Sequence, residues 1–331
     1  MLKAIILAAG KGTRMKSEKP KVVHEVLGKP MVYYSIEAAR AAGCDKVCVI
    51  VGYKAEEVEK SIKDTYAKLD KTEEMQDVVS YALQTEQLGT GHAVKCASDF
   101  IGTEGDVVVL CGDTPLVTGK TLEQAIKKHV AAGNGVTVIS AMLSDPFGYG
   151  RIIRDEKGLS KIVEQKDATE EEQAVREVNS GMYIFKCDAL LAALSQITND
   201  NAQGEYYLPD TIEIIKKMGL PVDAAAMEDA DQIKGVNTLE QLAEKANLSP
   251  NYVGMVERGL KEPGLATIVK LLNGLNVSAD TLLCDLVPSA SHVTDDEISK
   301  RLEGLTPMQK KAALDLLDTY IANLPYLTKE D

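Results

Sequence analysis

The chain has 331 residues, 45% of them hydrophobic, and carries 50 acidic against 37 basic side chains for a net charge of −13. This length allows two domains with at least one large core, and the acidic balance excludes a general attraction to nucleic acids or anionic membranes. No apolar stretch approaches the ~20 residues of a membrane span, and the first residues lead into a strand rather than a signal peptide, so we expect a cytoplasmic protein with no membrane association.

The first apolar run, residues 4–7, reads as a buried strand and leads into a glycine-rich loop. Residues 7–15 read LAAGKGTRM and carry Arg14, and Lys21 follows after Pro20. Backbone N–H groups and two cations on such a loop can surround a polyphosphate. The spacing does not fit the P-loop, and the third glycine of the dinucleotide fingerprint is lacking. The alternative is an ordinary turn, which the positions of Arg14 and Lys21 disfavour.

Short Val- and Ile-rich runs alternate with helix-like stretches over the first half of the chain. The predicted strands are residues 4–7, 47–51, 107–110 and 136–140, and the predicted helices are 32–42, 55–66 and 91–100. This alternation is typical of βαβ units and a doubly wound sheet. Ligands bind such sheets beyond the carboxyl ends of the strands, so we expect the loop at Gly10 and the turn at Gly112-Asp113 to meet there.

Residues 83–93, LQTEQLGTGHA, place an amide side chain and a Gly-Thr-Gly turn before a helix. The Gln84 amide offers a donor and an acceptor that suit the edge of uracil, and the glycines allow close approach of the backbone to a ribose or base. The alternative is a plain helix entry with Thr90 as the N-cap.

Residues 109–116, VLCGDTPL, place the Asp113 carboxylate just past a buried strand. Mg²⁺ prefers oxygen ligands and takes one or two protein carboxylates beside substrate phosphates, which is a role that Asp113 suits. The alternative is a simple turn before Thr114-Pro115.

From about residue 149 to 237 the pattern shifts, with strand-like pieces at 162–164 and 182–185, and we read this region as a sugar-binding half of the same domain. Three polar strings, GYGRI at 148–152, IVEQKDA at 162–168 and EVNSG at 177–181, could each be a surface charge or a loop amide, but their order and spacing together favour a binding site. A fourth string, NAQGEYYL, lies at 201–208. The polar and aromatic residues of the last string suit a saccharide wall, although we expect Tyr206 or Tyr207 to lie in the core.

Taken together, these strings resemble sugar-nucleotide pyrophosphorylases, and over residues 1–238 the uridylyltransferase domain of bifunctional N-acetylglucosamine-1-phosphate uridyltransferases. The resemblance implies an α/β fold, a Rossmann-like nucleotidyltransferase with a doubly wound mixed sheet. It implies transfer of UMP from UTP to N-acetylglucosamine 1-phosphate, with release of pyrophosphate. Glucose-1-phosphate enzymes usually read Ala-Gly-Gly at residues 8–10 and lack the string at 201–208, so the N-acetylated sugar is the expected substrate.

The resemblance also implies roles for single residues. Those implied in catalysis are Arg14, Lys21 and Asp113. Those implied in nucleotide binding are Leu7, Ala8, Ala9, Gly10, Lys21, Gln84, Gly89 and Thr90. Those implied in sugar binding are Gly150, Glu164, Asn179 and Tyr206, and those implied in binding Mg²⁺ are Asp113 and Asn237. Cys111 departs from the pattern, because relatives often carry a larger polar or aromatic residue there.

The region after Asn237 changes character. Residues 239–287 read as short helical segments and resemble the helix-turn-helix of phage-repressor-type regulators without its first helix. This module carries four basic and six acidic side chains, so we expect any DNA binding to be weak. Two alternatives stay open: a protein-interaction or dimerisation module, and an accidental recombination product.

The tail, residues 288–331, contains an amphipathic helix at 307–324 that would pack on this module or on a second copy, so a homo-oligomer is an open alternative. No six-residue repeat follows Asn237, and we therefore expect no acetyltransferase activity. For the whole chain the alternatives to the main prediction are a sugar-nucleotide-sensing transcriptional regulator and a uridylyltransferase for another hexose 1-phosphate. The candidate metal ligands favour the enzyme, since a sensor would not need them.

Overall fold

The computed structural model describes residues 1–12, 19–26, 28–155, 158–201, 203–233, 248–249, 252, 255–256 and 261–275. The chain divides into two compact units, Met1–Val277 and Ser278–Asp331, and the described residues all belong to the first. Among them no helix is long and apolar enough to cross a membrane.

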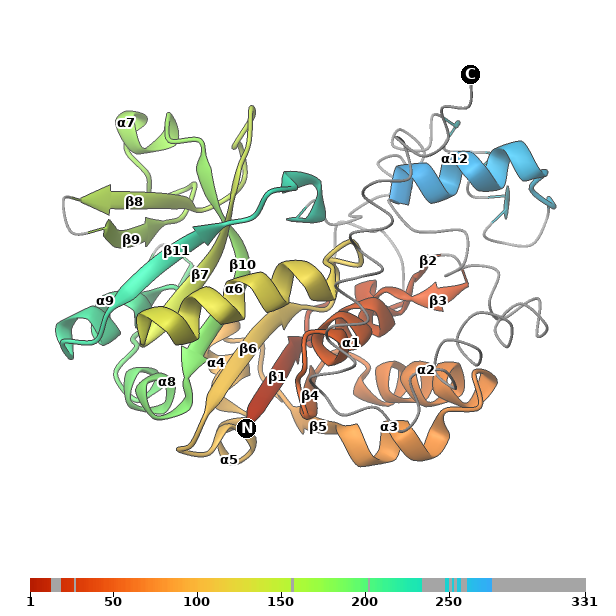
Figure 1. Ribbon diagram of the computed structural model, residues 1–331, viewed down its shortest axis with the longest axis horizontal. Helices are drawn as coiled ribbons and strands as arrows, with labels where there is room; N and C mark the ends of the chain where they lie inside the picture. Colours follow the sequence, from red (N-terminus) through yellow and green to blue (C-terminus); the bar gives the residue numbers. More distant parts are fainter. Residues whose placement is uncertain are drawn as a thin grey trace, which may run out of the picture. The chain divides into compact units, whose positions relative to one another are not determined.

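Strands and helices alternate over most of the described chain (Figure 1). The strands are β1 (Leu2–Leu7), β2 (Glu25–Val26), β3 (Lys29–Pro30), β4 (Lys46–Val51), β5 (Val79–Leu83), β6 (Asp106–Cys111), β7 (Val136–Met142), β8 (Arg151–Asp155), β9 (Gly158–Val163), β10 (Glu177–Lys186) and β11 (Val222–Ala226). The helices are η2 (Lys21–Val23), α1 (Met31–Ala41), α2 (Ala55–Lys68), α3 (Thr72–Val78), α4 (Thr90–Lys95), α5 (Ser98–Ile101), α6 (Gly119–Ala132), α7 (Glu170–Gln173), α8 (Cys187–Leu194), α9 (Asp210–Lys217), η3 (Ala230–Ile233) and α12 (Leu265–Leu275).

A mixed sheet organises the fold, in the order β11-β7-β10-β6-β1-β4-β5. Strands β6, β1, β4 and β5 are parallel, as the βαβ pattern predicts. Strand β10 runs antiparallel to both of its neighbours, β6 and β7. The β8–β9 ribbon branches from β10 and lies beside the main sheet (Figure 1). The sheet is therefore mixed, as expected, and its parallel half carries the glycine-rich loop.

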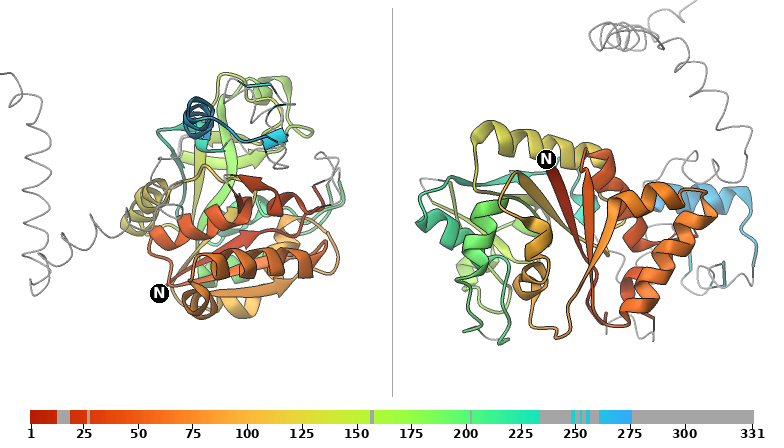
Figure 2. Two further views of the ribbon diagram at one scale, coloured as in Figure 1. Left: turned by 90° about the vertical axis from the view of Figure 1, so that its right-hand side faces the viewer. Right: turned by 90° about the horizontal axis from the view of Figure 1, so that it is seen from below.

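Both faces of the sheet are covered by helices (Figure 2), which is why the central strands β1, β4 and β6 are rich in buried apolar residues. Successive strand residues point to opposite faces, so Ala4 and Ile6 of β1 pack in the layer of α1, α2 and α6. Ile5 packs in the layer of α4, α8 and α9. All three side chains are fully buried. Strand β1 is therefore covered on both faces and lies between the two helix layers.

Local signals end the helices where the chain must turn. In α6, the Thr118 hydroxyl accepts a hydrogen bond from the N–H of Thr121, and Gly133 ends the helix in the left-handed conformation at φ 64°. The helix expected over residues 91–100 is instead two short helices, α4 and α5, because Cys96 and Ala97 form a turn between them. The strand expected at 162–164 begins earlier, as β9 at Gly158, and pairs with β8.

Candidate functional site

A cavity of about 250 Å³ lies at the carboxyl ends of β1 and β6. Its lining comes from both halves of the domain: Leu7, Thr90, Cys111, Glu164, Asn179, Gly181, Tyr183, Gln203, Glu205, Tyr207, Leu208 and Pro209. Four of the predicted nucleotide or sugar residues, Leu7, Thr90, Glu164 and Asn179, therefore share one cavity.

The two described residues with an expected catalytic role form an ion pair. The Lys21 Nζ lies 2.5 Å from the Asp113 carboxylate, and Lys21 is buried whereas the Asp113 side chain is about one-third exposed. A Cβ at Gly12 would lie 2.5 Å from the Cβ of Lys21, and Gly12 has φ +63°. Only glycine can therefore bring the loop after β1 this close to Lys21.

Sheet register explains why the loop and the Asp113 turn meet. Leu7 of β1 pairs with Cys111 of β6, and the N–H of Gly112 donates to the Leu7 carbonyl at 2.9 Å. Ala8 and Ala9 are buried, and the N–H of Ala8 donates to Ile50, which continues the sheet, while Gly10 is exposed. The thiol of Cys111 lies in the cavity wall, and burial raises its pKa to about 12, so it is a neutral wall residue.

The Gln84 segment forms one side of the site. Gln84 is 4% exposed and donates from Nε2 to the Gly89 carbonyl at 3.1 Å. Gly89 adopts φ +102°, and a Cβ there would lie 2.6 Å from the Tyr206 carbonyl oxygen. Thr90 begins α4, and its hydroxyl accepts a hydrogen bond from the N–H of Leu208. The segment is thus held against the string at 201–208.

The predicted sugar residues converge from three separate strings. A Cβ on Gly150 would lie 3.1 Å from the Glu164 Oε1, and the N–H of Asn179 donates to the Gly150 carbonyl at 2.9 Å. The Asn179 side chain donates from Nδ2 to the Tyr183 hydroxyl at 2.7 Å. Burial, with the charges of Asp167 and Asp210 adding to it, raises the pKa of the Glu164 carboxyl.

The two tyrosines of the 201–208 string lie differently. Tyr206 packs against the core, its N–H donates to the Leu88 carbonyl, and its ring lies 6.5 Å from that of His92. Tyr207 lines the cavity. The expectation that at least one of the pair lies in the core is met only in part, because Tyr206 is half-buried and packs against the core from its edge. Its assigned sugar contact stays a prediction.

Sequence reasoning missed several cavity residues. Tyr183 sits in an apolar run of β10, which predicts only a core residue. Gln203, Glu205 and Tyr207 lie within the string that we singled out, so their polar character was the available signal. Arg14, Asn237, more than half of the 239–287 segment and the whole 288–331 tail, with the helix expected at 307–324, lie outside the described residues.

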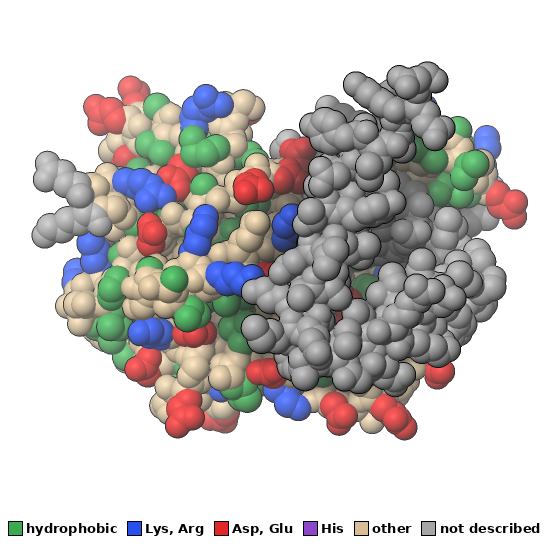
Figure 3. All heavy atoms as spheres, in the orientation of Figure 1, with side chains coloured by type: hydrophobic (Ala, Val, Ile, Leu, Met, Phe, Trp, Pro, Cys, Tyr) green, Lys and Arg blue, Asp and Glu red, His purple; other side chains and the backbone are tan. Residues whose placement is uncertain are grey.

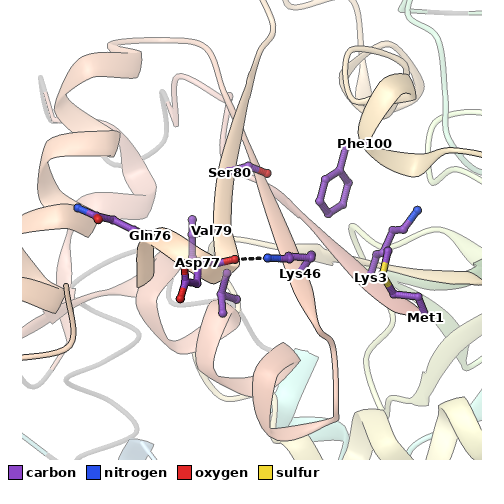
Figure 4. Close-up of a pocket in the computed structure, with 9 residues that line it drawn as sticks. Met1, Lys3, Lys46, Gln76, Asp77, Val79, Ser80 and Phe100 are labelled. Atoms are coloured by element: carbon purple, nitrogen blue, oxygen red, sulfur yellow. Dashed lines mark hydrogen bonds between the residues drawn. The ribbon is translucent and has the colours of Figure 1, made fainter. Parts of the chain in front are cut away.

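A second cavity, of about 290 Å³, lies at the opposite edge of the sheet, at the amino ends of β1, β4 and β5 (Figure 4). The two lysines of this cavity donate hydrogen bonds to carbonyls at the ends of helices. Lys3 donates to the Ile101 carbonyl at 2.6 Å, and Lys46 donates to the Asp77 carbonyl. These contacts satisfy the carbonyls that end α5 and α3. Although this cavity is slightly larger, the candidate residues gather at the carboxyl edge, which is where sheets of this kind bind ligands.

Known proteins share both parts of this chain. A profile of the nucleotidyl transferase family matches residues 3–231, and one of a helix-turn-helix family matches residues 237–282. A "Bifunctional protein GlmU" from Caldanaerobacter subterraneus subsp. tengcongensis is 52% identical over 243 residues, which is 73% of this chain and 50% of that protein. A protein of the same name from Acetivibrio thermocellus is 47% identical over 345 residues, which is 98% of this chain and 71% of that protein.

Several of the curated relatives are matched over about half of their length. The Acetivibrio alignment differs, since at 98% of this chain it extends well beyond residue 231 into the C-terminal region.

Solved structures share the fold. The structure of UDP-glucose pyrophosphorylase complexed with UDP-glucose has a TM-score of 0.58 at 21% identity, covering 70% of this chain and 96% of that one. The apo form of a UDP-glucose pyrophosphorylase has a TM-score of 0.56 at 22% identity, covering 69% and 91%. With the sheet order, the converging site and the match over residues 3–231, the chain belongs to the nucleotidyl transferase family.

Proposed function

We propose that this protein transfers UMP from UTP to N-acetylglucosamine 1-phosphate and so forms UDP-N-acetylglucosamine and pyrophosphate. The proposal is supported by about 50% identity to proteins named "Bifunctional protein GlmU" and by the motifs that resemble the uridylyltransferases of that pathway. The observation that carries it is the meeting of Leu7, Thr90, Glu164 and Asn179 in one cavity, with Lys21 and Asp113 at the same edge of the sheet.

In this reaction an oxygen of the sugar phosphate attacks the α-phosphorus of UTP. A new P–O bond forms as the bond to the β-phosphate oxygen breaks, and pyrophosphate leaves. The nucleophile is already an anion, so the protein needs no general base. Its contribution is alignment and neutralisation of charge, for which the Lys21 ammonium and the N–H groups of the loop at Gly10 are suited.

The donor chemistry at Asp113 fits Mg²⁺, which binds oxygen and takes only one or two protein carboxylates beside phosphates and water. Within the described part of the chain, no group of three or more His, Cys, Asp or Glu side chains could hold a metal ion by itself. The nucleotide phosphates, and Asn237 as the resemblance implies, would therefore complete the ligand set. Bound there, Mg²⁺ would neutralise charge that accumulates on the phosphates.

One side of the site would bind the nucleoside of UTP, and the other side would bind the sugar phosphate. Gln84, Gly89 and Thr90 would bind the base and ribose, while Gly150, Glu164 and Asn179 would bind the sugar. The Glu164 carboxylate can accept hydrogen bonds from sugar hydroxyls, and the Gly150 backbone is close to it.

The decisive experiment incubates the purified protein with UTP, Mg²⁺ and one sugar phosphate at a time, and measures pyrophosphate release and the UDP-sugar by mass spectrometry. We expect N-acetylglucosamine 1-phosphate to be preferred over glucose 1-phosphate and glucosamine 1-phosphate. A preference for glucose 1-phosphate would show that the proposed sugar substrate is wrong. If no pyrophosphate is released with any of the three sugar phosphates, the proposed function itself is wrong. Activity should vanish in excess EDTA and return with added Mg²⁺.

For the C-terminal region we propose a weak DNA-binding or self-association module, supported by the helix-turn-helix match at 237–282. The Acetivibrio alignment, which runs through most of this region, disfavours an accidental fusion because a second protein shares the segment. A cytoplasmic location agrees with this proposal, because UTP and DNA are both found there.

A further inference from the structure

The Gln84 side chain is held from two directions. It follows β5, is 4% exposed, and its backbone N–H donates to the Val51 carbonyl at 2.8 Å. Its Nε2 lies 3.1 Å from the Gly89 carbonyl oxygen and also 3.1 Å from the Nδ1 of His92. Both partners lie on the segment that leads into and forms α4.

These two contacts determine which way the amide faces. The Gly89 carbonyl can only accept, so the amide nitrogen of Gln84 must point toward it. An amide nitrogen cannot accept a hydrogen bond, so the contact with His92 requires that Nδ1 accept and that the ring proton sit on Nε2. Both hydrogens of the Gln84 amide are then used within the protein.

The amide oxygen is left as the group that a ligand can use. Within the described part of the chain, no hydrogen-bond donor contacts the Gln84 Oε1. The side chain therefore offers a ligand an acceptor and no donor. At ring position 3, uracil carries an N–H donor, whereas cytosine carries an unprotonated nitrogen that only accepts.

We propose that His92 is a positioning residue that keeps the Gln84 amide in this orientation and so makes the site select uracil over cytosine. The inference rests on the proposed function, and it adds the source of the base preference. His92 is itself held by α4, whose Gly91 N–H donates to the Tyr206 carbonyl at 2.8 Å, and its ring lies beside that of Tyr206. The string at 201–208 thereby supports the base-reading side of the site.

The test compares His92→Asn with His92→Leu. The Oδ1 of asparagine takes the place of Nδ1 and keeps the acceptor, whereas leucine fills a similar volume without one, and both variants lose the ring contact with Tyr206. A hydrogen bond of this kind contributes about 3- to 10-fold in binding. The ratio of kcat/KM for UTP to that for CTP should fall by about this factor in His92→Leu and stay near wild type in His92→Asn. The KM for the sugar phosphate should not change.

Binding of UTP and CTP without sugar phosphate, measured by calorimetry, supplies a readout that does not depend on turnover. If His92→Leu does not fold, His92→Gln is used, because its amide lies one bond further out and offers no acceptor at the Nδ1 position. An unchanged UTP-to-CTP ratio in the Leu or Gln variant, or an equal loss in the Asn variant, would overturn the role of His92. A wild-type protein that uses no nucleoside triphosphate would instead refute the proposed function.

Discussion

At the scale of single residues, the site pairs groups that are far apart in the sequence. Lys21 is buried beside Asp113, and Gly12 packs against the side chain of Lys21. A buried cation at hydrogen-bond distance from a carboxylate is held in one place, so it can meet phosphate charge without first reorganising.

Replacing Lys21 tests this role. We expect Lys21→Ala to lower kcat by about 100-fold or more, as is typical when a preorganised charge at the reacting phosphate is removed. Lys127→Ala is the matched control, because Lys127 is an exposed lysine on α6 whose ion pair is with Glu123. Steady-state pyrophosphate release measures both variants, and equal activities would argue against a phosphate contact for Lys21.

The raised pKa of the Glu164 carboxyl predicts how kcat/KM for the sugar phosphate depends on pH. Burial and the charge of Asp167 raise its pKa, so it takes up a proton at a higher pH than an ordinary glutamate and ceases to be an acceptor of two hydrogen bonds. Asp167→Asn removes a charge that raises this pKa. The acid limb of kcat/KM for the sugar phosphate should therefore move to lower pH in the variant. The phosphate of the substrate titrates identically in both proteins, so an unchanged limb would exclude Glu164 as its source.

At the scale of elements, the connection from β5 to α4 depends on close approach to another segment. Gly89 has a positive φ, and its Cα faces the backbone of Tyr206, while α4 is tied to the same carbonyl through Gly91. Two strings more than 100 residues apart are thus joined through backbone contacts that leave no room for a side chain.

We expect Gly89→Ala to impair the site far more than Gly219→Ala does. Both glycines have positive φ, but a Cβ at Gly219 meets no atom within 4 Å, so that change costs only about 1 kcal/mol of conformational strain. At Gly89 the clash with the Tyr206 carbonyl adds to this strain and displaces the nucleotide side of the site. Urea denaturation and UTP binding measure the two effects, and equal results for the two variants would contradict the packing argument.

At the scale of the whole molecule, charge limits what the C-terminal region can bind. Acidic and basic side chains are interspersed over the described face, without a continuous basic band there (Figure 3). The net charge is −13. In residues 239–287, four basic side chains stand against six acidic ones. We therefore expect any DNA complex to have few phosphate contacts, and a dimer that reaches two half-sites would be needed to hold it.

We expect DNA binding, if selected from random duplexes, to be seen only at low salt and to weaken steeply as salt rises. The variant for this test is Asn251→Ala. Tyr252 is left in place, because its ring contacts Lys261 and Thr267 and replacing it would disturb the packing of the module. A motif enriched by wild type and lost in the variant would support sequence reading. If both proteins retain the random duplexes equally and without a preferred motif, self-association remains as the role of the module, and analytical ultracentrifugation measures it.

The lack of a six-residue repeat after Asn237 gives a separate prediction for the whole chain. The purified protein should transfer no acetyl group from acetyl-CoA to glucosamine 1-phosphate, as followed by thiol release. Catalytic acetylation that co-purifies with uridylyl transfer would contradict it.

The sequence by itself determined three of the four parallel strands, β1, β4 and β6, because burial on both faces demands continuous apolar runs. It did not reveal β5, whose side chains are mostly only partly buried or exposed. The sequence also placed the glycine-rich loop directly after β1 and the Asp113 carboxylate just after β6, because both follow from residues that are close together in the sequence. Tertiary structure decided that β10 runs antiparallel and changes register between Asn179 and Met182, next to the Asn179 contact with Gly150. It also decided that Tyr207 lines the cavity while Tyr206 packs inward, and that His92 contacts Gln84. Local patterns encode which residues are buried, whereas partners distant in the chain are selected by strand register and by the space that packing leaves.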